Sequence, residues 1–257
     1  MHLIACIVCK KCIYSHIKEY IMSVFDTVVS IQSRPLPVII LADVSGSMNE
    51  IGKLDSLKHA LNNMISSFKD ASSSSLEAEI YVSIITFGNQ AANIILEPQS
   101  ASEIAKDPSK MIVINKMQAI GNTPLGKALT SLVDLLENRE IYPSRAYRPF
   151  IVLASDGKPN DLWQQPLDRL LNSERSKKAN RLALAIGADA DESMLKKFVN
   201  NEEMPIFKAN NAIEIQKFFK CVTMSAIKSS QSAKPGEIAP NDIISLSENV
   251  KELFDED

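Results

Sequence analysis

The segment 43–47, Asp-Val-Ser-Gly-Ser, has residue types and spacing suited to binding a cation. In an extended loop, side chains two residues apart point the same way, so Asp43, Ser45 and Ser47 can converge. Gly46 permits the tight backbone path that such a loop needs. One carboxylate and two hydroxyls are hard oxygen donors, which suit Mg²⁺ or Mn²⁺ better than metals that prefer thiolates. The segment therefore predicts a site for a divalent cation.

Two later segments carry oxygen donors of the same kind. Residues 121–126, Gly-Asn-Thr-Pro-Leu-Gly, supply the Thr123 hydroxyl at the expected start of a helix, with Thr123 as N-cap and Pro124 as first helical residue. Residues 155–157, Ser-Asp-Gly, supply the carboxylate of Asp156 just after an apolar run. Ligands of open parallel sheets bind beyond the carboxyl ends of the strands. The three loops meet there if their strands are neighbours.

Short apolar runs predict the strands that position these loops. Residues 38–42 and 150–154 lack polar alternation, which is typical of buried parallel strands. Residues 93–96 follow a predicted Gly88-Asn89 turn and should return as an antiparallel edge strand. The other expected strands cover 80–87, 182–186 and 206–207, and the expected helices cover 54–68, 123–136, 166–178, 192–199 and 215–226.

This alternation of strands with helices predicts an α/β fold: a doubly wound (Rossmann-like), mostly parallel sheet with one antiparallel edge strand and helices on both faces. Residues 97–120 give no regular pattern. We expect a leader over 1–21, either native or translated from a start codon upstream of Met22, then the folded domain over 22–228. The polar and acidic residues 229–257 predict a mobile C-terminal tail, in which one short helix can form.

The composition excludes several classes of protein. The 257 residues are 45% apolar and 23% charged, with a net charge of −3, which suits a soluble globular protein that binds neither nucleic acid nor a membrane surface. The apolar runs fall short of the roughly 20 residues that a membrane helix needs. Three of the four cysteines lie in the first 12 residues, and the remainder of the chain has only Cys221. This pattern favours a reducing, cytoplasmic compartment over a disulfide-built secreted domain.

Other motifs are weaker candidates for a site. Residues 121–127 nearly spell a phosphate-binding P-loop, but Ala128 stands where Ser or Thr is needed, and Pro124 offers no N–H. Cys6, Cys9 and Cys12, with His16, show part of the spacing of a metal or iron–sulfur site but lack a fourth cysteine. Simpler interpretations are a solvated helix residue for His59, core for Cys221, a ligand-facing or buried ring for Trp163, and a turn and helix cap for Asp189 and Asp191.

The three donor segments together resemble the metal-ion-dependent adhesion site (MIDAS) of von Willebrand factor A domains. The resemblance covers residues 36–227 and includes the whole metal motif: Asp43, Ser45, Ser47, Thr123 and Asp156. It implies direct coordination of Mg²⁺ or Mn²⁺ by the three hydroxyls, and direct or water-mediated coordination by the two carboxylates. The sequence around these residues is most similar to that of bacterial tellurium-resistance proteins of the TerY type.

The resemblance also implies a function. We expect a non-enzymatic module that binds a protein partner, whose acidic residue completes the coordination of the ion, in a bacterial cytoplasmic complex of the tellurite or stress response. Mg²⁺ often borrows ligand oxygens, and few carboxylates leave it attractive to an acidic group. Two alternatives stay open: a metal-dependent phosphoryl-transfer hydrolase, although no second carboxylate follows two residues after Asp43, and a subunit of a chelatase-like ATP-driven complex.

Overall fold

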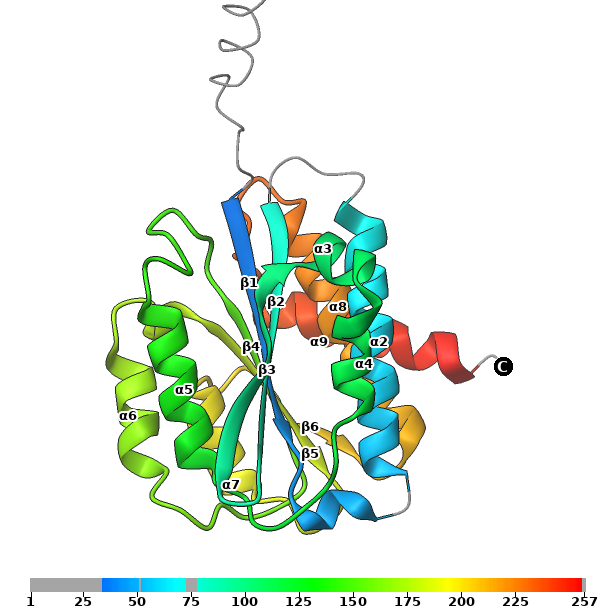
Figure 1. Cartoon of the computed structure of the whole chain (residues 1–257). Coiled ribbons are helices and arrows are strands. Elements are labelled where there is room, and N and C mark those ends of the chain that lie inside the picture. Colours follow the sequence, from blue (N-terminus) through cyan, green and yellow to red (C-terminus); the bar gives the residue numbers. More distant parts are fainter. Residues whose placement is uncertain (1–33, 51, 73–77, 256–257) are drawn as a thin grey trace, which may run out of the picture. The chain divides into compact units, whose positions relative to one another are not determined.

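The structure is a computed structural model that describes residues 34–50, 52–72 and 78–255 (Figure 1). The leader predicted over 1–21 and the cluster of Cys6, Cys9, Cys12 and His16 lie outside these residues. Among the described helices, none combines the length and the apolar character required to span a bilayer.

A six-stranded sheet forms the centre of the described chain, with strand order β3-β2-β1-β4-β5-β6. The strands are β1 (Arg34–Asp43), β2 (Ala78–Gly88), β3 (Ala91–Ser100), β4 (Phe150–Ser155), β5 (Asn180–Ile186) and β6 (Phe207–Ala209). β3 runs antiparallel to β2, and the other neighbouring strands are parallel. The predicted doubly wound, mostly parallel sheet with one antiparallel edge strand is confirmed. The tight turn between β2 and β3 lies one residue later than predicted, at Asn89 and Gln90, which both have positive φ.

Helices cover both faces of the sheet (Figure 1). They are α2 (Lys53–Ser72), α3 (Ala101–Lys106), α4 (Pro108–Asn115), α5 (Leu125–Glu137), α6 (Gln164–Asn172), α7 (Glu192–Val199), α8 (Ala212–Ser230) and α9 (Pro240–Asp255), with 3₁₀ turns η1 (Gly46–Asn49) and η2 (Ser176–Lys178). The helix predicted over 166–178 is thus two shorter elements, α6 and η2.

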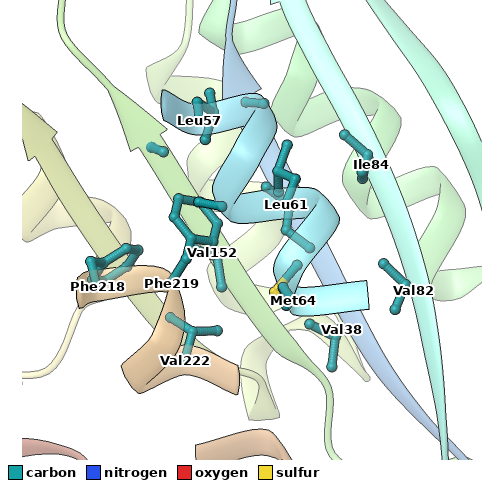
Figure 2. Packing of buried hydrophobic residues seen from close by; sticks show 14 of the residues in the cluster. Val38, Leu57, Leu61, Met64, Val82, Ile84, Val152, Phe218, Phe219 and Val222 are labelled. Carbon is teal, nitrogen blue, oxygen red and sulfur yellow. The ribbon is translucent and has the colours of Figure 1, made fainter. Parts of the chain in front are cut away.

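The core is divided by the sheet into two apolar clusters. Because side chains alternate along a strand, Val38 and Ile40 of β1 join one cluster, whereas Ile39 and Leu41 join the other. The first cluster lies under α2 and α8, where residues such as Leu61 and Phe219 pack on the sheet (Figure 2). The second lies under α5, α6 and α7. In β1 only Arg34 is exposed, so this central strand is a rigid base for the residues that follow it.

Two short helices, α3 and α4, occupy the stretch for which the sequence pattern predicts nothing regular. Each begins with a side-chain cap: the Ser100 hydroxyl accepts from the N–H of Glu103 at 3.2 Å, and the Asp107 carboxylate accepts from the N–H of Ser109 at 3.0 Å. Such caps satisfy donors that a short helix otherwise exposes. The start signals were therefore present, although the segments are too short for a helical period to stand out.

The C-terminal region differs from the predicted mobile tail. Residues 240–255 form α9, which packs on α8, and its Ile243 and Val250 are fully buried in the first cluster. Leu246 is partly buried beside them, and this spacing of three and then four residues forms one apolar stripe along a helix. The Lys228 ammonium also bonds to the Asp242 carboxylate at 2.9 Å. A stripe this short was hidden by the polar residues around it.

Candidate metal centre

The predicted donor residues lie at the carboxyl edge of the sheet. β1 and β4 are parallel neighbours, with Ala42 paired to Ala154, so Asp43 and Asp156 leave the sheet side by side. The loop 121–126 is joined to the loop 43–47 by a backbone hydrogen bond, in which the N–H of Gly46 donates to the carbonyl of Gly121 at 2.8 Å. The condition set by the sequence, that the strands before these loops be neighbours, is met for β1 and β4, whereas the loop 121–126 follows α4 and not a strand.

Asp43 is fully buried, and both of its carboxylate oxygens accept a hydrogen bond. Oδ1 accepts from the backbone N–H of Ser45 at 2.8 Å, and Oδ2 accepts from the hydroxyl of Ser155 at 2.5 Å. Burial raises the pKa of Asp43 to about 6; the bonds from Ser155 and Ser45 act in the opposite direction, and the nearby charge of Asp156 adds to the rise. Desolvation therefore makes this carboxylate a group that gains from a nearby cation.

A chain of hydroxyl contacts joins Ser45 and Ser47 to Asp156. The two serine hydroxyl oxygens are 3.1 Å apart, and the Ser47 hydroxyl donates to Oδ1 of Asp156 at 2.7 Å. The loop is not extended throughout, as the sequence suggested, because an extended Ser45 leads directly into the 3₁₀ turn η1. Ser45 and Asp156 are buried, whereas Ser47 is exposed, so the cluster opens to solvent at Ser47.

Gly157 marks the point where the third hydroxyl joins the cluster. A Cβ atom placed on Gly157 would lie 3.3 Å from Oγ1 of Thr123 and 3.8 Å from Oγ of Ser47. Both hydroxyls thus border the same small space, which a side chain at residue 157 would crowd. The structure brings all five predicted residues together.

Thr123 is not the N-cap that the sequence predicts. α5 begins at Leu125, and the N–H groups of Gly126 and Lys127 donate instead to the two carboxylate oxygens of Asp161, at 2.9 and 3.1 Å. Asp161 therefore satisfies the helix start and leaves the Thr123 hydroxyl to the cluster. The same bonds occupy N–H groups that a P-loop would direct at phosphate, which argues against the P-loop interpretation.

Lys53 is a site residue that sequence reasoning missed. Its ammonium, on the first residue of α2, bonds to Oδ2 of Asp156 at 3.1 Å and to Glu50 at 2.7 Å. Burial opposes protonation of Lys53, but the bonds and charges of Glu50 and Asp156 outweigh it and hold the lysine pKa above its usual value. The spacing of Glu50 and Lys53 was visible in the sequence, whereas the contact with Asp156 needed the fold.

The chemistry of the donor set fits a hard divalent cation. Two carboxylates and three hydroxyls supply only oxygen, the ligand type that Mg²⁺ and Mn²⁺ prefer. Over the described ranges, no group of three or more His, Cys, Asp and Glu residues is placed to hold a metal ion. Within this part of the chain, the five donor residues therefore do not belong to a larger metal site built from carboxylates, imidazoles or thiolates.

Of the remaining candidates, Asp191, Trp163 and Cys221 have structural roles. Asp191 caps α7 by accepting from the N–H of Met194 at 3.0 Å, as expected, and Asp189 is exposed in the preceding loop. Trp163 is half-buried against the second apolar cluster, with the Lys197 ammonium 5.6 Å from the centre of its ring. Cys221 is buried in the first cluster, and burial raises its pKa to about 11.

Comparison with known proteins places this arrangement among proteins of one fold. The family model for the von Willebrand factor type A domain matches residues 38–220. Similar solved structures include a von Willebrand factor type A protein from Catenulispora acidiphila (18% identity, TM-score 0.61, 76% of this chain and 43% of that chain). The pilus adhesin SpaC from Lactobacillus rhamnosus GG is similar over 77% of this chain and 31% of that chain (14% identity, TM-score 0.63).

A third similar structure is proximal thread matrix protein 1 from the mussel byssus with a zinc-occupied MIDAS motif (15% identity, TM-score 0.57, 76% of this chain and 48% of that chain). At these identities the likeness shows the fold alone. The chain spans less than half the length of these three structures. No match was found among curated proteins.

Proposed function

This chain belongs to the von Willebrand factor type A domain family, and from that premise we propose that it binds a protein partner through a divalent cation, Mg²⁺ or Mn²⁺. The proposed ligands are Asp43, Ser45, Ser47, Thr123 and Asp156. The observation that carries the proposal is the convergence of two buried carboxylates and three hydroxyls at one edge of the sheet. The zinc-occupied MIDAS motif of the mussel protein supports a divalent ion at such a position.

The residues around the ligands would prepare the site for an acidic partner. The bonds from Ser155 and from the N–H of Ser45 hold the Asp43 carboxylate in one orientation. When bound, the ion would supply a positive charge with room for an outside oxygen ligand. Lys53 adds a second positive charge beside Asp156. A carboxylate from the partner is the group that gains most from both charges.

Exposed apolar side chains at the same edge support a protein as the partner. Ile120 is 53% exposed, Leu162 is 87% exposed and Ile213 is 55% exposed, and each lies in or beside a loop at the carboxyl ends of the strands. Exposed apolar residues around a polar centre are typical of interaction surfaces. The proposed partner therefore presents an acidic residue among apolar ones, and we propose neither a nucleic acid nor a membrane as the target.

Titration calorimetry with Mg²⁺ and Mn²⁺ tests the metal site directly. We expect binding by the wild type, a sharp loss in Asp43→Ala and a smaller loss in Thr123→Ala. Thr130→Ala is the matched control, because this hydroxyl of α5 bonds to the carbonyl of Gly126 and not to the cluster. Equal affinities in all four proteins would remove the site.

A capture experiment tests the partner. Immobilised protein should retain its partner in Mg²⁺ and release it in EDTA, and Leu162→Ser should weaken capture without changing the affinity for Mg²⁺. Retention that ignores EDTA would exclude an ion bridge, whatever the calorimetry shows.

We further propose that the protein acts in a bacterial, cytoplasmic complex of the tellurite or stress response, as TerY-like proteins do. The support is the similarity of the sequence at residues 36–38, 121–126 and 155–161 to that of TerY-like proteins. The single cysteine of the described ranges, Cys221, is a free buried thiol, which suits a reducing compartment. Tellurite sensitivity after deletion of the gene, reversed by the wild type and not by Asp43→Ala, is the expected result in the native host. Unchanged resistance would refute this context alone.

We propose binding and not catalysis for this site. Phosphoryl transfer needs a nucleophile or a positioned general base beside the ion. His59, the one histidine within the described ranges, is exposed on α2. Sustained Mg²⁺-dependent phosphatase turnover that disappears in Asp43→Ala would overturn the assignment.

A further inference from the structure

A second polar site lies at the amino ends of the parallel strands, the edge opposite the candidate metal centre. It is a pocket of about 630 Å³ beside the starts of β1, β4 and β5. Six cations line it: Arg34, Arg139, Arg148, Arg175, Lys178 and Lys234. Only three carboxylates accompany them: Glu137, Glu174 and Glu237. The chain as a whole has a net charge of −3, so this excess of positive charge is local.

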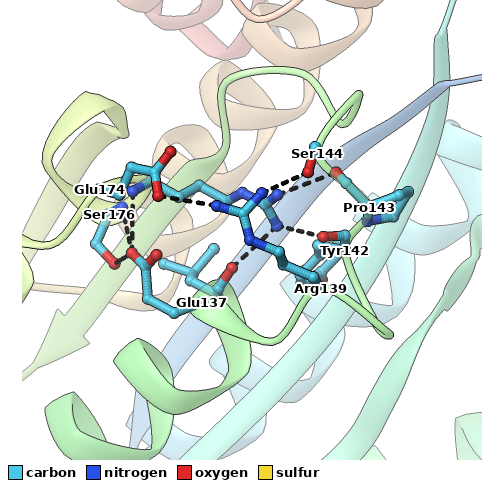
Figure 3. A network of polar contacts seen from close by, with 9 residues as sticks. Glu137, Arg139, Tyr142, Pro143, Ser144, Glu174 and Ser176 are labelled. Carbon is cyan, nitrogen blue, oxygen red and sulfur yellow. Dashed lines mark hydrogen bonds and ion pairs between the residues drawn. The ribbon is translucent and has the colours of Figure 1, made fainter.

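Two of the three carboxylates form ion pairs with cations of the lining, which leaves the other four cations without an ion pair among the described residues. Glu174 bonds to Arg139 at 2.8 Å, and Glu237 is 3.9 Å from Lys234. An oxygen of Glu137 accepts from the backbone N–H groups of Arg175 and Ser176 and from the Ser176 hydroxyl at 2.9–3.0 Å (Figure 3). These bonds fix Glu137 at the side of the pocket.

Arg175 is a rigid part of the pocket wall. Its guanidinium donates to the carbonyl oxygens of Leu136 at 3.0 Å, Tyr142 at 2.5 Å and Pro143 at 3.0 Å. Neutral carbonyls orient a guanidinium without cancelling its charge. The loop that carries Tyr142 and Pro143 is thereby held to η2.

Three further cations of the lining have no carboxylate partner among the described residues. Arg34 donates through Nε to the carbonyl of Arg145 at 2.6 Å and stacks over the Tyr147 ring at 3.9 Å, which leaves its terminal nitrogens available. Arg148 and Lys178 are exposed and make no ion pair within the described ranges. Unpaired cations that line one pocket repel each other unless an anion joins them.

The opposite wall of the pocket is pinned in place by Gly236. Its φ is +85°, and a Cβ atom there would lie 2.7 Å from the backbone nitrogen of Arg148. The N–H of Gly236 donates to the Ser229 hydroxyl at 2.8 Å, and its carbonyl accepts from the Asn180 amide at 2.8 Å. The segment between α8 and α9 is therefore fixed against the start of β4, and the pocket is a built feature of the fold.

We propose that this pocket binds a small molecule that carries a diphosphate or triphosphate group. Guanidinium forks pair with phosphate oxygens through two parallel bonds, and Lys178 adds a point charge. The volume falls in the range of roughly 300–1,000 Å³ that is usual for small-ligand pockets. Several unpaired cations match a ligand with several adjacent charges better than a single carboxylate.

Calorimetry with pyrophosphate and with ATP, on the full chain in EDTA, tests the proposal. EDTA and an Asp43→Ala background keep metal chelation at the other edge out of the measurement. We expect binding of pyrophosphate that weakens about tenfold in Arg148→Gln or Lys178→Gln, since each variant removes a positively charged donor to the phosphate oxygens. Lys177→Gln is the matched control, because Lys177 lies on the same turn outside the pocket lining.

The relative affinities for ATP and pyrophosphate identify the ligand class. Tighter binding of ATP than of pyrophosphate would identify a nucleotide as the source of the phosphates, and equal binding would identify the phosphate chain alone. No binding of either compound, or equal weakening by Lys177→Gln, would overturn the proposal. All three substituted residues are exposed, and thermal melting of each variant verifies that the fold is retained.

Discussion

The two edges of the sheet have opposite chemistry. At the carboxyl edge, carboxylates and hydroxyls face one another around Asp156, an arrangement of negative charge and lone pairs. At the amino edge, arginines and lysines outnumber carboxylates in the pocket lining. The net charge of −3 gives no sign of this separation. A parallel sheet makes it possible, because all loops that leave the strands gather at one end and all loops that enter them gather at the other.

The edges also differ in how their charged groups are held. Asp43 and Asp156 accept bonds from hydroxyls, which keep lone pairs of their own for a cation. Arg175 donates to carbonyls and keeps its charge for an anion. At Asp43 and at Arg175, neutral partners orient a charged group without neutralising it, whereas Asp156 is also paired with Lys53. The comparison predicts that each edge can be disabled while the other keeps its function.

Glycine substitutions should have the largest effect, on stability at both edges. Gly121→Ala and Gly236→Ala combine a left-handed φ with a Cβ atom 2.7 Å from backbone, so we expect each to lower the free energy of unfolding by about 3 kcal/mol in urea denaturation. Gly52 has a φ of +76° but open space around its Cβ position, and Gly52→Ala should cost only about 1 kcal/mol. If Gly52→Ala lowers the free energy of unfolding as much as Gly121→Ala and Gly236→Ala do, the close backbone contacts at those two glycines do not contribute to stability.

Asp156→Asn should weaken cation binding at the carboxyl edge without changing anion binding at the amino edge. We expect the affinity for Mn²⁺ to fall at least about 100-fold, because the variant removes the charge of a buried carboxylate that we propose as a ligand, while pyrophosphate binding stays at the wild-type level. Asp189→Asn, an exposed carboxylate at the same edge, is the control in calorimetry. Parallel losses of both ligands in Asp156→Asn would mean that the edges are coupled.

Lys53→Met should raise the affinity of the carboxyl edge for a cation. Removal of the ammonium from Asp156 and Glu50 leaves more negative charge for the ion, so we expect Mg²⁺ to bind up to about tenfold more tightly. Lys58→Met on the same helix removes a lysine paired with Asp55 and should leave the affinity unchanged. Weaker binding in Lys53→Met would show that the lysine supports the ion site and does not compete with it.

Asp161→Ala should have the smallest effect, a loss of about 1 kcal/mol in stability from the uncapped start of α5. Asp168→Ala, an exposed aspartate on α6, provides the baseline in the same denaturation experiment. If Thr123→Ala destabilises the metal-free protein more than Asp161→Ala does, the threonine and not Asp161 is the effective cap.

The sequence predicted the sheet and the gathering of five donor residues because both depend on local patterns. Buried strands such as β4 are continuous apolar runs, and four of the five donors lie at or just after the ends of such strands, whereas Thr123 precedes α5. Lys53 and Asp161 escaped prediction because their partners are 103 and 35 residues away, where only the fold brings them together. The basic pocket is harder still, since its lining comes from the segments 34, 137–149, 174–178 and 233–237.

The burial of α9 against α8 bears on how the domain could be produced as a fragment. A fragment cut at residue 220, where the family match ends, would divide α8 and remove its second half, with the buried Cys221 and Val222, together with all of α9. The remaining residues of the first apolar cluster would lose this cover, and exposed apolar surface of this kind favours aggregation. A fragment that extends through residue 255 keeps this face closed.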